Sequence, residues 1–347
     1  MCRWPFRACK MKLGAQYGYW TREPKLDIVS VGLEAENLGY DSLWTGESYS
    51  SDAFTPLCWV GAHTSKIKLA TGIAQLGART PATLAMQAMT LDALSGGRFC
   101  LGIGVSGPQV IEGWHGQPFG KPIARTKETI DIIRKILLRD EPVTANGPNL
   151  PLPYPKGAPN SWGLGKPLKL INKPLRSDIP IYLGAEGPKN IALAFEECEG
   201  WLPLYYSPSR PEIYQLPHSK LKEDFEIAVN VNVNICDNVS EGLFMQKAIL
   251  AFYIGGMGSQ SRNFHTELMA RMGYESEANN IQSLFLSGKR DEAIRAVPDA
   301  FADEISLVGP LERIKERLEL WEKSPVTTLI IGANDLETMR LMAELVL

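Results

Sequence analysis

The sequence predicts an α/β protein built as a (β/α)8 barrel, the TIM-barrel fold. Short apolar, often β-branched runs alternate with stretches whose apolar residues recur at helical spacing, the pattern of repeated strand–helix units. Eight such strands occur with no linker between them, and 347 residues suit one barrel that carries insertions. A doubly wound dinucleotide-binding sheet would need a glycine loop after the first strand. Here that strand leads into residues 16–20, Gln-Tyr-Gly-Tyr-Trp.

Each element follows from its own pattern. Gly39 ends the first helix, and Pro81 begins the third at its first turn. The predicted strands span residues 11–17, 41–44, 68–74, 98–105, 180–184, 200–205, 225–235 and 326–331. The predicted helices span residues 24–38, 54–63, 81–94, 124–138, 188–198, 311–321 and 336–346.

Two insertions interrupt this rhythm. Residues 139–180, after the fourth strand–helix unit, are rich in proline and glycine and show no periodic pattern. A long segment of this kind is usually a lid or a binding segment, and we expect it to exclude water from the active site. A helix-rich insertion, residues 240–300, follows the seventh strand.

Composition excludes several classes of function. A net charge of −3 gives no electrostatic reason to expect a nucleic-acid partner, and no apolar run approaches the roughly 20 residues that span a membrane. Six scattered cysteines without a C-x-x-C pair and four unpaired histidines predict a reducing compartment and no metal site. The basic start lacks the apolar stretch of a secretory signal. We therefore expect a cytoplasmic protein with a disordered extension over residues 1–10 and one domain over residues 11–347.

In such a barrel, function collects where strands end. Those positions are rich in aromatic and amide side chains, which suits a flat conjugated ligand better than hydrolysis. Glu47 is a candidate general acid or base, or else accepts hydrogen bonds from loop amides. His115 is the second candidate, with a solvent-facing loop histidine as the alternative. Trp44 belongs to the predicted pocket or to the core.

A small-residue loop, residues 183–190, opens a predicted helix. Its free N–H groups and the helix dipole would attract an anion, although a plain strand-to-helix turn also needs glycine. The glycines of residues 102–107 are a weaker signal, because the next predicted helix opens only at residues 122–127.

Four runs, residues 42–47, 68–73, 92–104 and 180–187, resemble the luciferase-like monooxygenase superfamily. The most specific is Leu-Ser-Gly-Gly-Arg-Phe, residues 94–99, followed by Leu-Gly-Ile-Gly. Residues 104–122 resemble its coenzyme F420-dependent branch. The resemblance covers residues 11–347. Members of this superfamily usually form homodimers or higher homo-oligomers, and the resemblance implies the same here.

The resemblance implies a cofactor site at the barrel mouth. The ring would lie over a bulge in the third strand, backed by a cis peptide between Gly72 and Ile73, with Trp44 and Thr71 beside it. The cofactor phosphate would be held by Ala185, Glu186 and Gly187, and by Ser106 and Gly107. Because the charge of Glu186 would repel a phosphate, its side chain must point away.

The chain departs from the sugar-phosphate dehydrogenases of this branch. It has Ser48 where they keep a histidine and Pro108 where they keep a glutamate. That substrate class is therefore not expected. The resulting hypothesis is hydride transfer between F420 and a small organic substrate. An FMN-dependent monooxygenase is the first alternative, and a non-catalytic flavin-binding carrier is the second.

Overall fold

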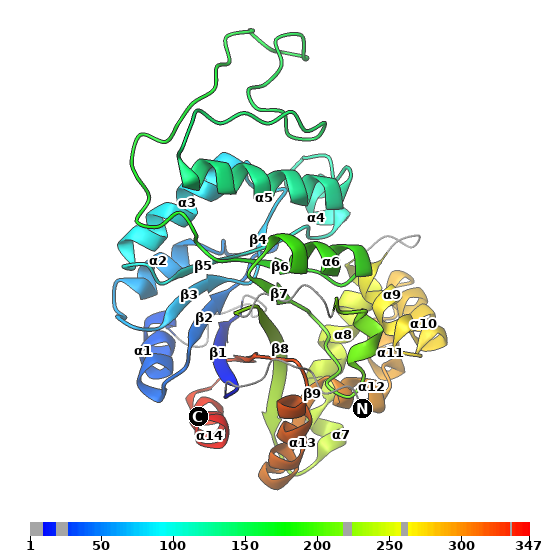
Figure 1. Cartoon of the computed structure of the whole chain (residues 1–347). Helices are drawn as coiled ribbons and strands as arrows, with labels where there is room; N and C mark the ends of the chain where they lie inside the picture. Colours follow the sequence, from blue (N-terminus) through cyan, green and yellow to red (C-terminus); the bar gives the residue numbers. More distant parts are fainter. Residues whose placement is uncertain (1–9, 19–26, 218–223, 258–262, 334) are drawn as a thin grey trace.

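A parallel β-sheet, closed into a barrel and surrounded by helices, forms the centre of the molecule (Figure 1). The computed structural model describes residues 10–18, 27–217, 224–257, 263–333 and 335–347. Its strands are β1 (Lys12–Tyr17), β2 (Ser42–Thr45), β3 (Lys68–Thr71), β4 (Ala74–Gln75), β5 (Phe99–Gly104), β6 (Ile181–Gly184), β7 (Gly200–Leu202), β8 (Glu226–Ile235), β9 (Ser306–Gly309) and β10 (Thr328–Gly332).

The barrel closes because β10 pairs with β1 and also with β8. Thr328 of β10 lies in register with Lys12 on one side and with Ala228 on the other. Strands β3 and β4 are the two halves of one interrupted barrel strand, and both pair with β5. Strand β9 pairs only with the far end of β8. In the described part of the chain this leaves eight barrel strands in parallel, so the predicted TIM-barrel fold is confirmed.

The helices cover the outside of the barrel. Their bounds are α1 (Ile28–Leu38), α2 (Thr55–Gly61), α3 (Pro81–Leu94), α4 (Pro108–Gly113), α5 (Pro122–Leu138), α6 (Pro188–Glu197), α7 (Val239–Gly242), α8 (Phe244–Gly256), α9 (Phe264–Arg271), α10 (Glu275–Leu286), α11 (Arg290–Ala296), α12 (Asp299–Glu304), α13 (Leu311–Lys323) and α14 (Leu336–Val346), with a 3-10 turn, η1 (Pro211–Tyr214). The predicted bounds of α3 and α14 are confirmed to the residue. Helices α7 to α12 make up the predicted helical insertion, and none of the described helices combines the length and apolar character needed to cross a bilayer.

Two apolar regions hold the barrel together. The larger fills the space between the outer faces of the strands and the helices. The smaller lies inside the barrel and consists of Trp44, Ala70, Cys100, Tyr182, Ala228 and Ile330. Burial raises the pKa of the Cys100 thiol to about 12, so this cysteine is an uncharged packing residue, as the sequence predicted.

The run of residues 94–99 fixes the amino-terminal end of the barrel. Gly96 and Gly97 have φ of 68° and 88°, which only glycine adopts readily, and they turn the chain from α3 into β5. The Arg98 guanidinium then donates to the carbonyl oxygens of four residues and to the Thr64 hydroxyl, at 2.7 to 3.2 Å. The four carbonyls belong to Gly61, Thr64, Ile67 and Ser95. The motif thus joins the turns before β3 and β5.

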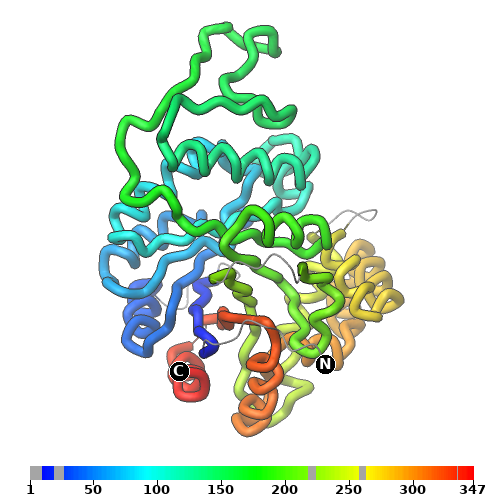
Figure 2. The backbone as a smooth tube through the Cα atoms, in the orientation of Figure 1, coloured from blue at the N-terminus to red at the C-terminus, as the bar shows by residue number. Residues whose placement is uncertain are grey.

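The insertion of residues 139–180 is not a lid over the barrel mouth, which corrects the expectation from sequence. It follows α5, which runs back along the barrel, so it leaves and rejoins the fold at the amino-terminal end of the strands. Arg176 there pairs with buried Asp92 at 2.7 Å and donates to the Phe99 carbonyl. The segment extends beyond α5, away from α8 to α11 (Figures 1 and 2).

Other differences are smaller. The sequence showed no signal for β9, because four residues between two helices are too few for an alternation pattern. The predicted extension falls almost wholly outside the described residues, so it and the single-domain assignment stay predictions.

We expect Arg98→Lys to lower the free energy of unfolding by at least about 2 kcal/mol. A lysine cannot reproduce the planar fan of donors, and buried carbonyls then lose charge-assisted hydrogen bonds. Urea denaturation followed by circular dichroism measures the change. Arg295→Lys, at an exposed position of α11, is the control and should stay within about 0.5 kcal/mol of the wild type. Equal stability of the two variants would contradict the anchoring role.

Candidate active site

A bulge between β3 and β4 shapes the barrel mouth. The Gly72–Ile73 peptide is cis, as the resemblance implied. Around it, the Thr71 hydroxyl donates to the Gly102 carbonyl at 2.7 Å and accepts from the Gly102 N–H at 2.9 Å. A Cβ atom on Gly102 would overlap the Thr71 carbonyl oxygen, so glycine is required there. Thr71 therefore ties the bulge to β5 and has its hydroxyl occupied.

The floor of the mouth is made of small residues and one branched side chain. A Cβ atom on Gly104 or Gly184 would lie 3.0 or 3.1 Å from the Ile73 side chain, which therefore packs over both glycines. Trp44 supports Gly72 from inside the barrel and donates to the Ser42 hydroxyl at 2.8 Å. Since Trp44 is only 2% exposed, it is a support beneath the mouth. The surface of the bulge is therefore formed by glycines and the Ile73 side chain.

The loop after β6 presents backbone donors. Neither the Glu186 nor the Gly187 N–H has a hydrogen-bond partner among the described residues. The Glu186 carboxylate lies 2.9 Å from His265 Nδ1 of α9. The backbone carbonyl of Glu186 accepts from the Arg271 guanidinium at 2.7 Å. A Cβ on Gly187 would have no heavy atom within 4 Å. The acidic side chain is thus held toward α9, while the space beside Gly187 is open.

Ser106 and Gly107 lie in the neighbouring loop, because β5 and β6 pair with Gly104 opposite Gly184. Ser106 has a φ of 58°, a left-handed conformation that costs a non-glycine residue about 1–2 kcal/mol and is found often at functional sites. Gly107 begins α4 directly. This corrects the expectation that the next helix starts only near residue 122, since six residues are too few to show helical periodicity.

The Glu47 side chain is buried, and both of its carboxylate oxygens accept hydrogen bonds. Its carboxylate forms a two-pronged pair with Arg79, in which Nη2 donates to Oε2 at 2.9 Å. It also accepts from the N–H groups of Gln75, at 2.7 Å, and Ala53, at 3.1 Å. Of the two roles that the sequence left open, these contacts correspond to the acceptor of loop amides.

His115 is linked to Glu47 through the side chain of Gln75. The Gln75 amide nitrogen donates to the Glu47 carbonyl at 3.2 Å, so its oxygen faces His115 Nε2 at 2.8 Å. A carbonyl oxygen can only accept, so Nε2 carries the hydrogen and Nδ1 of the neutral ring is a proton acceptor. His115 is half-buried, and this chain of contacts gives it a defined tautomer.

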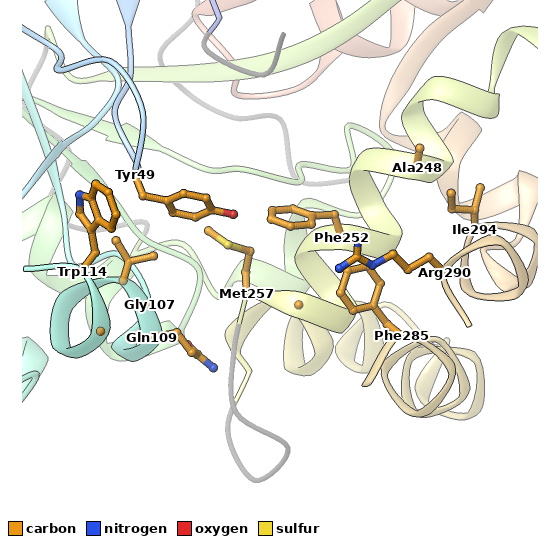
Figure 3. A pocket seen from close by; sticks show the side chains of 13 residues that line it. Tyr49, Gly107, Gln109, Trp114, Ala248, Phe252, Met257, Phe285, Arg290 and Ile294 are labelled. Atoms are coloured by element: carbon orange, nitrogen blue, oxygen red, sulfur yellow. The ribbon is translucent and has the colours of Figure 1, made fainter. Parts of the chain in front are cut away.

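Ser48, next in the chain to Glu47, has a buried hydroxyl with no partner among the described residues. A buried hydroxyl without a hydrogen bond is costly, which makes it a donor available to a ligand. The adjacent Tyr49 and Trp114 line a cavity of about 690 Å³ together with residues of α8, α10 and α11 (Figure 3). Sequence reasoning missed these helices as site elements, because their apolar spacing reads as ordinary packing.

Residues 11–328 match the family model described as luciferase-like monooxygenase. The chain is 46% identical to a candidate coenzyme F420-dependent oxidoreductase of Mycobacterium tuberculosis, over 97% of this chain and 99% of that one. It is 25% identical to the 5,10-methylenetetrahydromethanopterin reductase of Methanolobus tindarius, over 90% of this chain and 91% of that one.

Two solved structures share the fold. The coenzyme F420-dependent tetrahydromethanopterin reductase of Methanopyrus kandleri has a TM-score of 0.77 at 22% identity, covering 97% of this chain and 99% of that one. The oxygenating constituent of 3,6-diketocamphane monooxygenase from Pseudomonas putida, solved with FMN, has a TM-score of 0.64 at 19% identity, covering 97% and 98%. At these identities the likeness concerns the fold alone.

We expect Glu47→Gln to destabilise the protein by about 3–5 kcal/mol, because it removes the buried carboxylate and leaves the Arg79 guanidinium with only the more exposed Asp52, at 3.9 Å, as a countercharge. The double variant Glu47→Gln/Arg79→Met should recover part of that loss, and urea denaturation measures both. Glu319→Gln, which breaks an exposed pair with Lys323, is the control and should change stability by less than about 1 kcal/mol. A Glu47→Gln variant as stable as the wild type would leave the carboxylate free for a chemical role.

Proposed function

The chain belongs to the luciferase-like monooxygenase family, and we propose that it is an oxidoreductase that transfers a hydride between coenzyme F420 and a small organic substrate. The observation that carries this proposal is the barrel mouth. There a floor of glycines and Ile73 lies beside a loop whose Glu186 and Gly187 N–H groups have no partner among the described residues. The relative that is 46% identical over nearly its whole length is named for the same cofactor.

The residues present fit a flat cofactor with a phosphate. The N–H groups of Glu186 and Gly187, at the start of α6, would hold the phosphate together with Ser106 of the neighbouring loop. The contact with His265 keeps the Glu186 carboxylate directed at α9, so its N–H can serve an anion. The buried Ser48 hydroxyl supplies a further unused donor at the mouth. Bound F420 would supply a two-electron hydride carrier at this place.

The residues of this chain would position the cofactor and the substrate, and one of them would accept or donate a proton. We assign the proton-handling role to His115, whose Nδ1 is the acceptor in the tautomer that Gln75 selects. Glu47 then acts as a positioning residue, because it holds Gln75 and is itself saturated by Arg79. This divides the two candidate residues of the sequence between two roles.

The FMN alternative would use the same fold and the same loop after β6. An FMN-containing monooxygenase is among the structural neighbours, but only at 19% identity, whereas the relative named for F420 is 46% identical. We therefore place F420 first. The carrier alternative predicts tight binding without any substrate that reoxidises the reduced cofactor. A homodimer and a cytoplasmic location stay predictions.

A fluorescence-quenching titration with F420 and FMN tests the cofactor. We expect wild-type protein to bind F420 at least about tenfold more tightly than FMN, a difference of about 1.4 kcal/mol. Gly187→Val should raise the Kd for F420 by a similar factor, because the side chain occupies the open approach to the loop. The same variant should keep the wild-type circular dichroism, since no atom of the fold is near.

Lys315→Ala, on the exposed face of α13, is the control for that titration. Tighter binding of FMN would favour the monooxygenase alternative. An unchanged F420 affinity in Gly187→Val would place the phosphate elsewhere.

We expect His115→Gln to reduce turnover by about 10²–10⁴ with any active substrate, at unchanged F420 affinity. The glutamine amide nitrogen can still donate to Gln75, but the ring Nδ1 is gone. Steady-state kinetics of the wild type and the variant checks this. His63→Gln, on an exposed turn, is the matched control. Full activity of His115→Gln would move the proton transfer to water or to Ser48.

A further inference from the structure

The cavity beside the barrel mouth lies between two layers of the fold. Tyr49 and α4 form one side, and α8, α10 and α11 form the other (Figure 3). Its volume of about 690 Å³ is within the range of small-molecule sites. Three of the residues that line it, Tyr49, Gly107 and Trp114, are next in the chain to residues of the barrel mouth. Those residues are Ser48, Ser106 and His115. The cavity is therefore a continuation of the proposed active site.

Aromatic side chains face the cavity from both ends. Trp114 and Tyr49 are 67% and 50% exposed, with ring centroids 6.5 Å apart. At the other end, Phe252 and Phe285 meet edge to face at 6.0 Å. Large aromatic groups left open to solvent in a concave place indicate a surface that a ligand covers. The rings suit a ligand that is itself flat and apolar.

Two glycines of α8 set the shape of this end of the cavity. A Cβ atom on Gly256 would lie 2.7 Å from the Phe285 ring, and one on Gly255 would overlap the Phe285 side chain. Helix α10 can therefore bring Phe285 against the backbone of α8. The aromatic wall depends on that close approach.

Arg290 is the only charged side chain among the described residues that line the cavity. Its guanidinium lies 5.6 Å from the centre of the Phe285 ring, and no carboxylate of the described residues pairs with it. The nearby Glu292 pairs instead with Lys289. Arg290 is also the first residue of α11, where a cation is unfavourable to the helix dipole. Apart from this cation–π contact with Phe285, the charge of Arg290 has no partner among the described residues.

We propose that this cavity is the substrate pocket and that its substrate is a ring-bearing, largely apolar anion. The acidic group pairs with Arg290, and the ring system lies among Trp114, Phe252 and Phe285. The reacting end lies toward Tyr49, where the cavity meets the mouth. The assignment of the cavity to a substrate rests on the proposed function, whereas its preference for an aromatic anion does not.

Two fluorescent probes test the preference on the protein without cofactor. One is 1-anilinonaphthalene-8-sulfonate, an aromatic anion, and the other is N-phenyl-1-naphthylamine, the same ring system without the sulfonate. We expect Arg290→Gln to weaken binding of the sulfonate about tenfold and to leave the amine unchanged. Arg295→Gln, on the same helix but outside the cavity, has the same net charge and should change neither. Phe252→Ala should weaken both probes.

Equal sulfonate affinity in Arg290→Gln and Arg295→Gln would overturn the proposal. So would retention of both probes by Phe252→Ala, because the dyes would then bind elsewhere. A titration of Arg290→Gln with F420 adds a third result. If that variant loses affinity for F420, Arg290 serves the anionic part of the cofactor and the substrate assignment is wrong. Failure of the wild type to bind F420, with the probe results as expected, would refute the proposed cofactor alone.

Discussion

The ion pair between the buried Glu47 carboxylate and the half-buried Arg79 organises the barrel mouth. The Glu47 carboxylate joins the loop after β2, the end of β4 and the segment before α3, because it accepts from Ala53, Gln75 and Arg79 together. Gln75, held in this way, orients His115 across the mouth. A charge so deeply placed is tolerable only when every acceptor site is filled, and here the filling also sets the geometry of the neighbouring site. The Glu47 side chain therefore both stabilises the fold and positions the candidate site.

Much of the fold could be predicted from the sequence, because periodicity reports which face of an element is buried. Helices α3 and α14 were predicted to the residue; Pro81 begins α3, and in the structure the Asp335 side chain caps α14 by accepting from the Thr338 N–H. Strand β9 and helix α4 escaped because they are too short to show a period. The insertion of residues 139–180 was recognised as irregular, but its place at the far end of the barrel, where Arg176 pairs with Asp92 across 84 residues, was not predicted.

The candidate site divides in the same way. Residues after the strands, from Gly72 to Gly187, could be named because parallel strands in a barrel end at one rim. The acceptor role of Glu47 was one of two roles left open, but its pairing with Arg79 could not be predicted, since only the folded chain brings the two together. Phe252 and Arg290 belong to helices whose apolar spacing is that of any packed helix. Nothing in the chain order shows that Gly255 and Gly256 leave room for a ring from α10.

The turn of residues 94–99 lies at the opposite end of the barrel from the proposed chemistry. Arg98 there fastens loops and touches no part of the mouth. The motif that resembles the superfamily most specifically therefore stabilises the barrel. Features at the amino-terminal end of a barrel contribute to stability. Relatives gathered by this motif would share an architecture while differing in what they convert. Differences in substrate should instead follow the residues around Tyr49, Trp114 and Arg290. Substitutions at these positions leave the barrel fold intact.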